Sequence, residues 1–171
     1  MTETATADRS GDEDWERFSD PLQSFGHLAR VTFRTFARNL ESRTLPHGIS
    51  IGQWRFLREL WREDGITQRE LSTRLDMREP STVAAVRSLE NAGLVRRQRD
   101  KHDRRKIRVH LTAKAKRLRS PLLRHVSDVN AIATAGIPAR DLDTARRVML
   151  SLIANLNAAS GGATLTEDAE P

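Results

Sequence analysis

A chain of 171 residues can form one ordinary domain with an appended helical module. The absence of cysteine excludes disulfides, thiolate metal sites and cysteine redox sensing. No apolar run is long enough to cross a bilayer, and the acidic start of the chain lacks the features of a secretory or mitochondrial signal, so we expect a cytoplasmic protein without a membrane partner. The net charge of +6 hides an asymmetry: residues 1–20 carry two Arg against seven Asp and Glu, whereas residues 66–124 carry seventeen Lys and Arg against six Asp and Glu, which favours a polyanion as partner.

The first periodic segment follows the acidic tail. Residues 1–19 lack apolar periodicity and are predicted to be disordered. Over about 21–40, apolar residues recur at helical spacing, which predicts a helix followed by a loop at 44–48. Ser50 is then a predicted N-cap, because its hydroxyl can accept a backbone N–H of the second helix.

Two closely spaced helices are predicted next. Ile66 forms a short extended link after the second helix, and Thr67 with Glu70 three residues later has the pattern of a capping box. Pro80 suits the first turn of the following helix, and Gly93 suits the position just after its end. This succession predicts a helix-turn-helix.

Residues 94–112 are the most informative part of the chain. Two short β-like runs flank a cation-dense turn, and the second run, 106–111, alternates polar and apolar residues in period two. An arginine at a hairpin tip suits the minor groove of DNA, where the negative potential is strong, so the hairpin predicts contact with duplex DNA. The alternative for Arg96, Arg97 and Arg99 is that they only solvate a strand edge and prevent edge-to-edge pairing.

The remainder of the chain is predicted to be helical. Thr112 begins a long helix, Pro138 interrupts it, and a last helix runs to about Leu156. The predicted fold class is therefore mainly α with a small β-hairpin wing, in which a winged helix-turn-helix is combined with further helices.

The sequence at this point resembles the MarR family of bacterial transcription regulators. The resemblance covers about 21–156 and rests on three segments: 65–71 (GITQREL), 89–95 (LENAGLV), and 103–105 (DRR) through Leu111 and Thr112. Ala115 stands where the family often has Gly, and we expect it only to tighten the start of the next helix.

The resemblance implies DNA contacts from the supporting helix, the recognition helix and the wing. Arg105 is expected in the minor groove, and Asp103 is expected to orient it or to tie the wing to the body. Alternatives stay open: Arg87 pairs with a carboxylate such as Asp103 and does not contact DNA, and Thr67 with Glu70 forms only a cap. The recognition helix is poor in Arg, which leaves the identity of its base contacts open. The predicted DNA-binding residues are Thr67, Gln68, Arg78, Ser81, Thr82, Val83, Ala84, Arg87, Asp103, Arg104, Arg105 and Lys106.

The helices outside the winged module have apolar faces larger than a monomer of this layout needs. In the MarR family such helices interleave between two chains, so the resemblance implies a homodimer on a near-palindromic DNA site. The alternative is that they pack only on their own chain. The predicted organisation is a disordered acidic tail (1–19), a helical dimerisation region (20–48 and 112–158), a winged helix-turn-helix domain (49–111) and a flexible tail (159–171).

Many members of the family release DNA when a small molecule binds between the helical and winged modules, so the resemblance implies a ligand-responsive repressor. Residues 77–83 also resemble members that govern aromatic-acid catabolism. Arginine and histidine beside aromatic side chains suit an anionic aromatic ligand, such as a phenolic acid or its CoA thioester. The alternative is that the apolar residues of this set are core and the cations are solvated. The candidate lining residues are His27, Arg30, Val31, Arg34, His47, Trp54 and Leu57.

Two other functions stay open: a regulator without small-molecule sensing, and a non-specific architectural or RNA-binding protein. Residues 66–124 contain no Phe, Trp or Tyr, which argues against RNA binding, because RNA readers interleave aromatics with basic residues. An enzyme is not predicted, since there is no cysteine, no Gly-rich phosphate loop and no clear nucleophile–base pair. No metal site or cofactor is predicted either, because no two histidines stand at i, i+4 in the set His27, His47, His102, His110 and His125.

Overall fold

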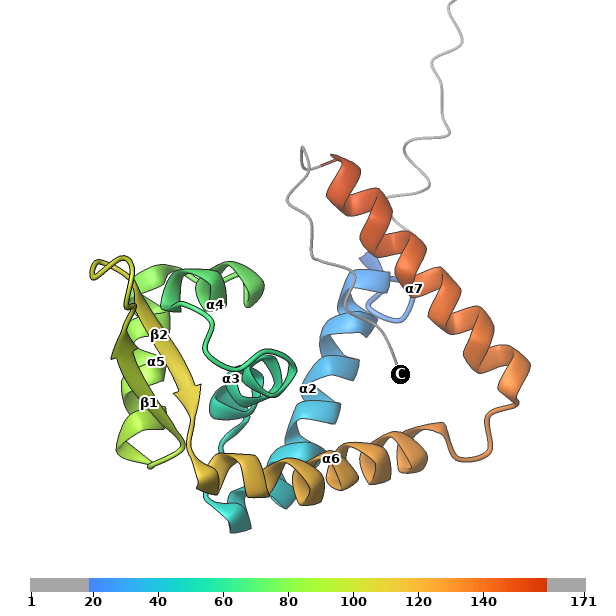
Figure 1. The fold of residues 1–171 in the computed structure, drawn as a ribbon. Helices are drawn as coiled ribbons and strands as arrows, with labels where there is room; N and C mark the ends of the chain where they lie inside the picture. The colour runs from blue at the N-terminus through green and yellow to red at the C-terminus, as the bar shows by residue number, and fades with distance from the viewer. Residues whose placement is uncertain (1–18, 160–171) are drawn as a thin grey trace, which may run out of the picture. The chain divides into compact units, whose positions relative to one another are not determined.

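The computed structural model describes residues 19–159 and shows a mainly helical chain with one two-stranded hairpin (Figure 1). Apart from Ser19 and Ala159, the predicted tails lie outside the described residues. The chain forms two compact units, divided between Asn39 and Leu40. The predicted fold class, a winged helix-turn-helix with additional helices, is confirmed.

The first described helix, α2 (Phe25–Thr44), begins later than predicted. The prediction of a helix from about 21 was wrong at its start because Asp20 forms a turn: its carboxylate accepts the N–H of Leu22 at 2.9 Å, and its carbonyl accepts the N–H of Gln23 at 3.0 Å. Ser24 then accepts the N–H of His27 at 3.3 Å and starts the helix. A short 3₁₀ turn, η1 (Leu45–His47), follows α2.

Three helices form the body of the winged module: α3 (Ile51–Arg62), α4 (Gln68–Arg74) and α5 (Glu79–Asn91). Ser50 caps α3 as predicted, and its hydroxyl accepts the N–H of Gln53. Each helix directs an apolar face into a common core, which therefore fixes α5 against α3 and α4. The fully buried members of this core include Leu57, Leu60, Leu71, Val86, Leu89 and Leu94.

The hairpin consists of β1 (Val95–Arg99) and β2 (Ile107–Leu111), paired antiparallel with Val95 opposite Leu111. Residues 65–66 add a short third segment: the N–H of Gly65 donates to the Val109 carbonyl at 3.0 Å, and the N–H of Val109 donates to the Ile66 carbonyl at 2.9 Å. The link predicted at Ile66 thus pairs with β2 beside the two-stranded sheet, and it joins the wing to the start of α4.

Gly65 has a conformation that only glycine adopts without strain. Its φ is +85°, and a Cβ at this position would lie 2.7 Å from Cε1 of His110. Because Gly65 has no side chain, the backbone of the segment after α3 can lie against the imidazole of His110 on β2. Gly93 likewise has φ +68° and ends α5, as predicted.

Two long helices follow the wing in the described part of the chain, α6 (Ala113–Thr134) and α7 (Ala139–Ala159). Thr112 caps α6 by accepting the N–H of Ala115. The indole N–H of Trp61 donates to the Ala115 carbonyl at 3.1 Å, which ties α3 to the first turn of α6. None of the residues of α7 is buried, and among the described helices none is both long and apolar enough to span a membrane.

Candidate nucleic-acid interface

A hollow on the surface of the winged module brings together its three parts. The start of α4, the first turns of α5 and the wing all line it. Six of the twelve predicted DNA-binding residues lie here: Thr67, Gln68, Val83, Asp103, Arg105 and Lys106. The other lining residues are Arg69, Glu79 and Ile107.

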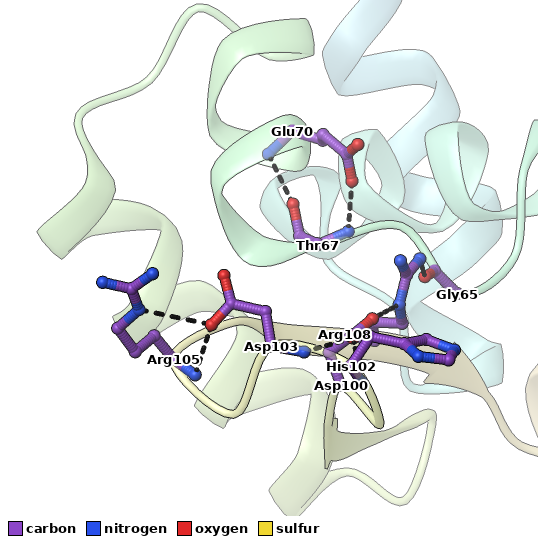
Figure 2. A network of polar contacts seen from close by, with 8 residues as sticks. All are labelled: Gly65, Thr67, Glu70, Asp100, His102, Asp103, Arg105 and Arg108. Atoms are coloured by element: carbon purple, nitrogen blue, oxygen red, sulfur yellow. Dashed lines mark hydrogen bonds and ion pairs between the residues drawn. The ribbon is translucent and has the colours of Figure 1, made fainter.

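The tip of the wing carries an exposed guanidinium held by a carboxylate (Figure 2). Oδ1 of Asp103 accepts both the backbone N–H of Arg105, at 3.1 Å, and its Nε, at 3.3 Å. The side chain of Arg105 is 93% exposed. Of the two contacts predicted for Asp103, the structure shows the one with Arg105. Among the described residues Asp103 forms no ion pair with Arg87. The carboxylate that the charge of Arg87 acts on is Glu90, whose pKa it helps to lower after the larger effect of Arg97.

Asp100 and Arg108 hold the wing in shape, and neither is among the residues predicted from the sequence. Oδ1 of Asp100 accepts the N–H of His102 at 2.8 Å and of Asp103 at 3.0 Å, while Oδ2 accepts Nε of Arg108. Arg108 also donates from Nη1 to the Gly65 carbonyl at 2.9 Å (Figure 2). The N–H of Asp103 and the guanidinium of Arg108 hold the pKa of Asp100 far below its ordinary value of 3.8. The sequence does carry a signal for Asp100. It lies two residues before His102 and three before Asp103, whose N–H groups it accepts, which is the pattern of an Asx turn.

The start of α4 has the predicted capping box. The N–H of Thr67 donates to Oε2 of Glu70 at 2.7 Å, and the Thr67 hydroxyl accepts the N–H of Glu70 at 3.1 Å. The hydrogen bond from the Thr67 backbone lowers the pKa of Glu70. Thr67 is buried, so the cap is its structural role, and Gln68 beside it is half-buried.

The recognition helix α5 presents the predicted outward residues with one exception. Ser81, Ala84 and Arg87 are exposed, and Val83 is half-buried. Thr82 is 1% exposed, so its predicted contact with DNA was wrong. The reason is helical periodicity, because Thr82 lies on the core face together with Val86 and Leu89. Arg78 is exposed at the N-cap of α5, and Arg104 is exposed on the wing.

Family comparison agrees with this geometry. The MarR family model matches residues 47–106, the span from η1 to the wing. The crystal structure of a MarR transcriptional regulator from Methanosarcina mazei Go1 is 31% identical, with a TM-score of 0.69, over 77% of this chain and 96% of that one. The chain belongs to the MarR family.

Two curated relatives are also transcriptional regulators by name. TtmR of Methylorubrum extorquens (strain PA1) is 29% identical over 71% of this chain and 59% of its own length. The putative regulatory protein for the hcr operon of Thauera aromatica is 33% identical over 50% of this chain and 52% of its own. This MarR chain therefore spans less than two thirds of the curated relatives it matches.

Two more distant structures share the MarR fold and hold ligands. Reduced AbfR bound to DNA is 22% identical with a TM-score of 0.70, over 86% of this chain and 98% of that one. CouR from Rhodococcus jostii RHA1, bound to p-coumaroyl-CoA, is 20% identical with a TM-score of 0.66, over 77% and 93% of the two chains.

One strand arginine of this MarR chain has a structural partner. Arg97 donates from Nε to Oε2 of Glu90 at 2.8 Å, and its backbone N–H donates to Oε1 at 3.2 Å. This bond lowers the pKa of Glu90. The alternative of a merely solvated strand edge was therefore wrong for Arg97, which ties β1 to the end of α5. Arg96 and Arg99 are exposed.

The predicted effector residues fall in both compact units. In the first, Arg30, Val31 and Arg34 are exposed, and Nη2 of Arg30 lies 3.2 Å from Nδ1 of His27. In the second, His47 is half-buried against His125, whereas Trp54 and Leu57 belong to the core, which is the alternative that the sequence left open for them.

We expect the Asp100→Asn variant to loosen the wing at neutral pH, because it removes the charge that binds Arg108. A carboxyl whose pKa is lowered by folding contributes stability above its ordinary value of 3.8 and loses it as the pH falls through the lower folded value. The difference in unfolding free energy between wild type and variant should be constant from neutral pH to about 5 and shrink below about 3.8. Urea unfolding followed by tryptophan fluorescence at several pH values measures it.

The matched control is Asp143→Asn, which removes an exposed carboxylate that binds Arg146 on α7 at 2.6 Å. A pH profile for Asp143→Asn equal to that of Asp100→Asn would contradict the role assigned to Asp100.

Proposed function

We propose that the protein is a sequence-specific, DNA-binding transcription regulator that acts as a homodimer. The observation that carries the proposal is the shared hollow, in which the tip arginine of the wing and the recognition helix face the same side of the module. α5 fits the major groove, and Arg105 then meets the adjacent minor groove. The DNA-bound structure of AbfR, which has this fold, supports the assignment.

The charges in the hollow allow a DNA phosphate to replace a carboxylate as the partner of an arginine. Its two acidic residues each face an arginine: Glu79 lies 3.8 Å from Arg69, and Asp103 lies 3.3 Å from Arg105. Both arginines are largely exposed, so each ion pair stabilises the free protein by at most about 1 kcal/mol. A DNA phosphate can therefore take over either guanidinium at little cost.

Base recognition falls to the exposed face of α5. Val83 and Ala84 suit thymine methyl groups, Ser81 suits a base edge or phosphate, and Arg87 suits a guanine or phosphate. Arg104 and Lys106 at the wing hold the backbone. The family relatives named above are regulators, which supports this function over an enzyme.

We expect Arg105→Ala to weaken specific DNA binding by about 1–3 kcal/mol, which is about 5- to 150-fold in Kd. Arg119→Ala on α6 removes the same charge from an exposed position outside the hollow and should change Kd little. Fluorescence anisotropy at one salt concentration measures both, with the intergenic DNA upstream of the gene and with random DNA of equal length. Equal affinity of the wild type for both DNAs would favour the non-specific architectural alternative instead.

The homodimer is proposed from the exposed apolar side chains of α6 and α7. Ile132 on α6, Val148, Met149, Leu150, Ile153 and Leu156 on α7 are large, apolar and exposed. Side chains of this kind on one long helix mark an interaction surface. A second copy is the occupant that two-fold DNA recognition requires, since it places two recognition helices about 34–36 Å apart.

We expect Leu150→Glu to convert a dimer into a monomer, because it places a charge among these apolar side chains. Ser151→Glu is the control, since it adds the same charge at an exposed position already occupied by a polar residue. Light scattering coupled to size-exclusion chromatography gives the mass of each. A monomeric wild type, or a dimeric Leu150→Glu, would contradict this surface as the interface.

We further propose a repressor function in which an anionic aromatic molecule, free or as its CoA thioester, releases the DNA. CouR, which shares the fold, is bound to p-coumaroyl-CoA. The exposed Arg30 and Arg34 of α2, with His27 beside Arg30, are cations suited to a carboxylate or phosphate.

A thermal-shift screen of aromatic acids and their CoA esters tests the effector. A true effector raises Tm by binding the folded state and also weakens DNA binding in the anisotropy assay. The double variant Arg30→Ala, Arg34→Ala should lose the thermal shift but still bind DNA. If no compound both stabilises the protein and releases DNA, the regulator without small-molecule sensing is the better description.

A further inference from the structure

Two histidines far apart in the sequence meet in the second compact unit. Nε2 of His47, in η1, lies 3.3 Å from Nε2 of His125, on α6. Their ring centroids are 5.4 Å apart and the rings are tilted by 46°. Sequence spacing gives no sign of this pair, because 78 positions separate its members.

The distance between the two nitrogens is the one that a tetrahedral metal imposes. Zn²⁺ binds imidazole nitrogen at about 2.0–2.1 Å, and two such bonds at the tetrahedral angle place the nitrogens about 3.3–3.4 Å apart. The alternative is a hydrogen bond between the rings, in which one Nε2 donates and the other accepts. That bond satisfies one proton, whereas a metal uses the lone pairs of both rings.

The surroundings of His125 favour a metal ligand. Oδ2 of Asp128, one turn further along α6, lies 3.9 Å from Nδ1 of His125. A carboxylate on this side favours the tautomer with the proton on Nδ1, which leaves Nε2 free to bind a metal. The side chain of His125 is 28% exposed, so the pair is accessible to an ion from solvent.

Both histidines are held by buried neighbours. η1 is closed by the bond from the Gly48 N–H to the Leu45 carbonyl at 2.8 Å. The buried Thr44 fastens this turn, because its hydroxyl donates to the Ile49 carbonyl at 2.8 Å. On α6, Leu122 and Val129 on either side of His125 are buried. The two imidazoles are therefore brought together by packed backbone on both sides.

We propose that His47 and His125 bind a divalent transition metal of the zinc class through their Nε2 atoms. The described residues contain no cluster of three or more His, Asp and Glu side chains suited to a metal, so this chain supplies two ligands and water fills the other positions. Such a metal links the connection before α3 to the middle of α6. It thereby stabilises the folded state by an amount that grows with the logarithm of the metal concentration above Kd, independently of DNA binding.

The test uses metal-stripped full-length protein and Zn²⁺ titrated against a chromophoric chelator. The wild type is expected to bind one Zn²⁺ per chain, and His47→Gln and His125→Gln are each expected to bind at least tenfold more weakly. His102→Gln is the control, because His102 is an exposed histidine of the wing and reports adventitious binding. The rise of Tm on adding Zn²⁺ should vanish in His47→Gln and His125→Gln and persist in His102→Gln.

X-ray absorption of the zinc-loaded wild type keeps the proposal testable where a variant fails to fold. Two imidazole nitrogens at about 2.0–2.1 Å from the metal support the site. A single imidazole, the absence of stoichiometric binding, or an equal loss of affinity in His102→Gln would overturn it and leave the pair as a hydrogen bond between rings.

Discussion

The wing depends on a single carboxylate. Asp100 binds two N–H groups of the turn through one oxygen and the guanidinium of Arg108 through the other. The guanidinium of Arg108 also donates to the Gly65 carbonyl, so Asp100 is linked through Arg108 to the segment that leads into α4 (Figure 2). A hairpin of two strands is marginal alone in water. The position of Arg105 at the exposed tip of the wing therefore rests on a chain of polar contacts more than on the strands themselves.

A second polar link operates at the other end of the hairpin. Asp64 accepts the N–H of Leu111 at 2.8 Å and binds Nζ of Lys116 at 2.8 Å. These bonds lower the pKa of Asp64 against the opposing effect of its partial burial, which is the largest single influence on it. Together with the bond from Trp61 to Ala115, this link fixes the first turns of α6 to both α3 and β2. The helix that follows the wing is thus anchored to the module that carries it.

Much of this fold could be predicted from local sequence, because its helices start and end with strong short-range signals. The caps at Ser50 and Thr67 and the glycine after α5 act within a few residues of their position. The same reasoning placed the wing and most outward positions of α5. It misassigned Thr82, although the spacing to Val86 and Leu89 already put it on the core face.

What the sequence did not show were contacts between elements. In the sequence Arg97 is one cation among many, and only the fold places Glu90 beside it. His47 and His125 likewise look isolated in the sequence, and only the packing of η1 near α6 brings them together. Partners of this kind depend on packing in three dimensions, which periodicity does not encode.

The exposed apolar side chains of α7 have a consequence for how the proposed dimer responds to the amount of protein. No residue of α7 is fully buried among the described residues, which fits the proposed dimer, in which a second copy covers this helix. Where single chains predominate, occupancy of a two-fold DNA site by paired chains rises with about the square of the chain's abundance. If the protein acts as the proposed dimer, a modest change in its synthesis or turnover becomes a steep change in transcript output.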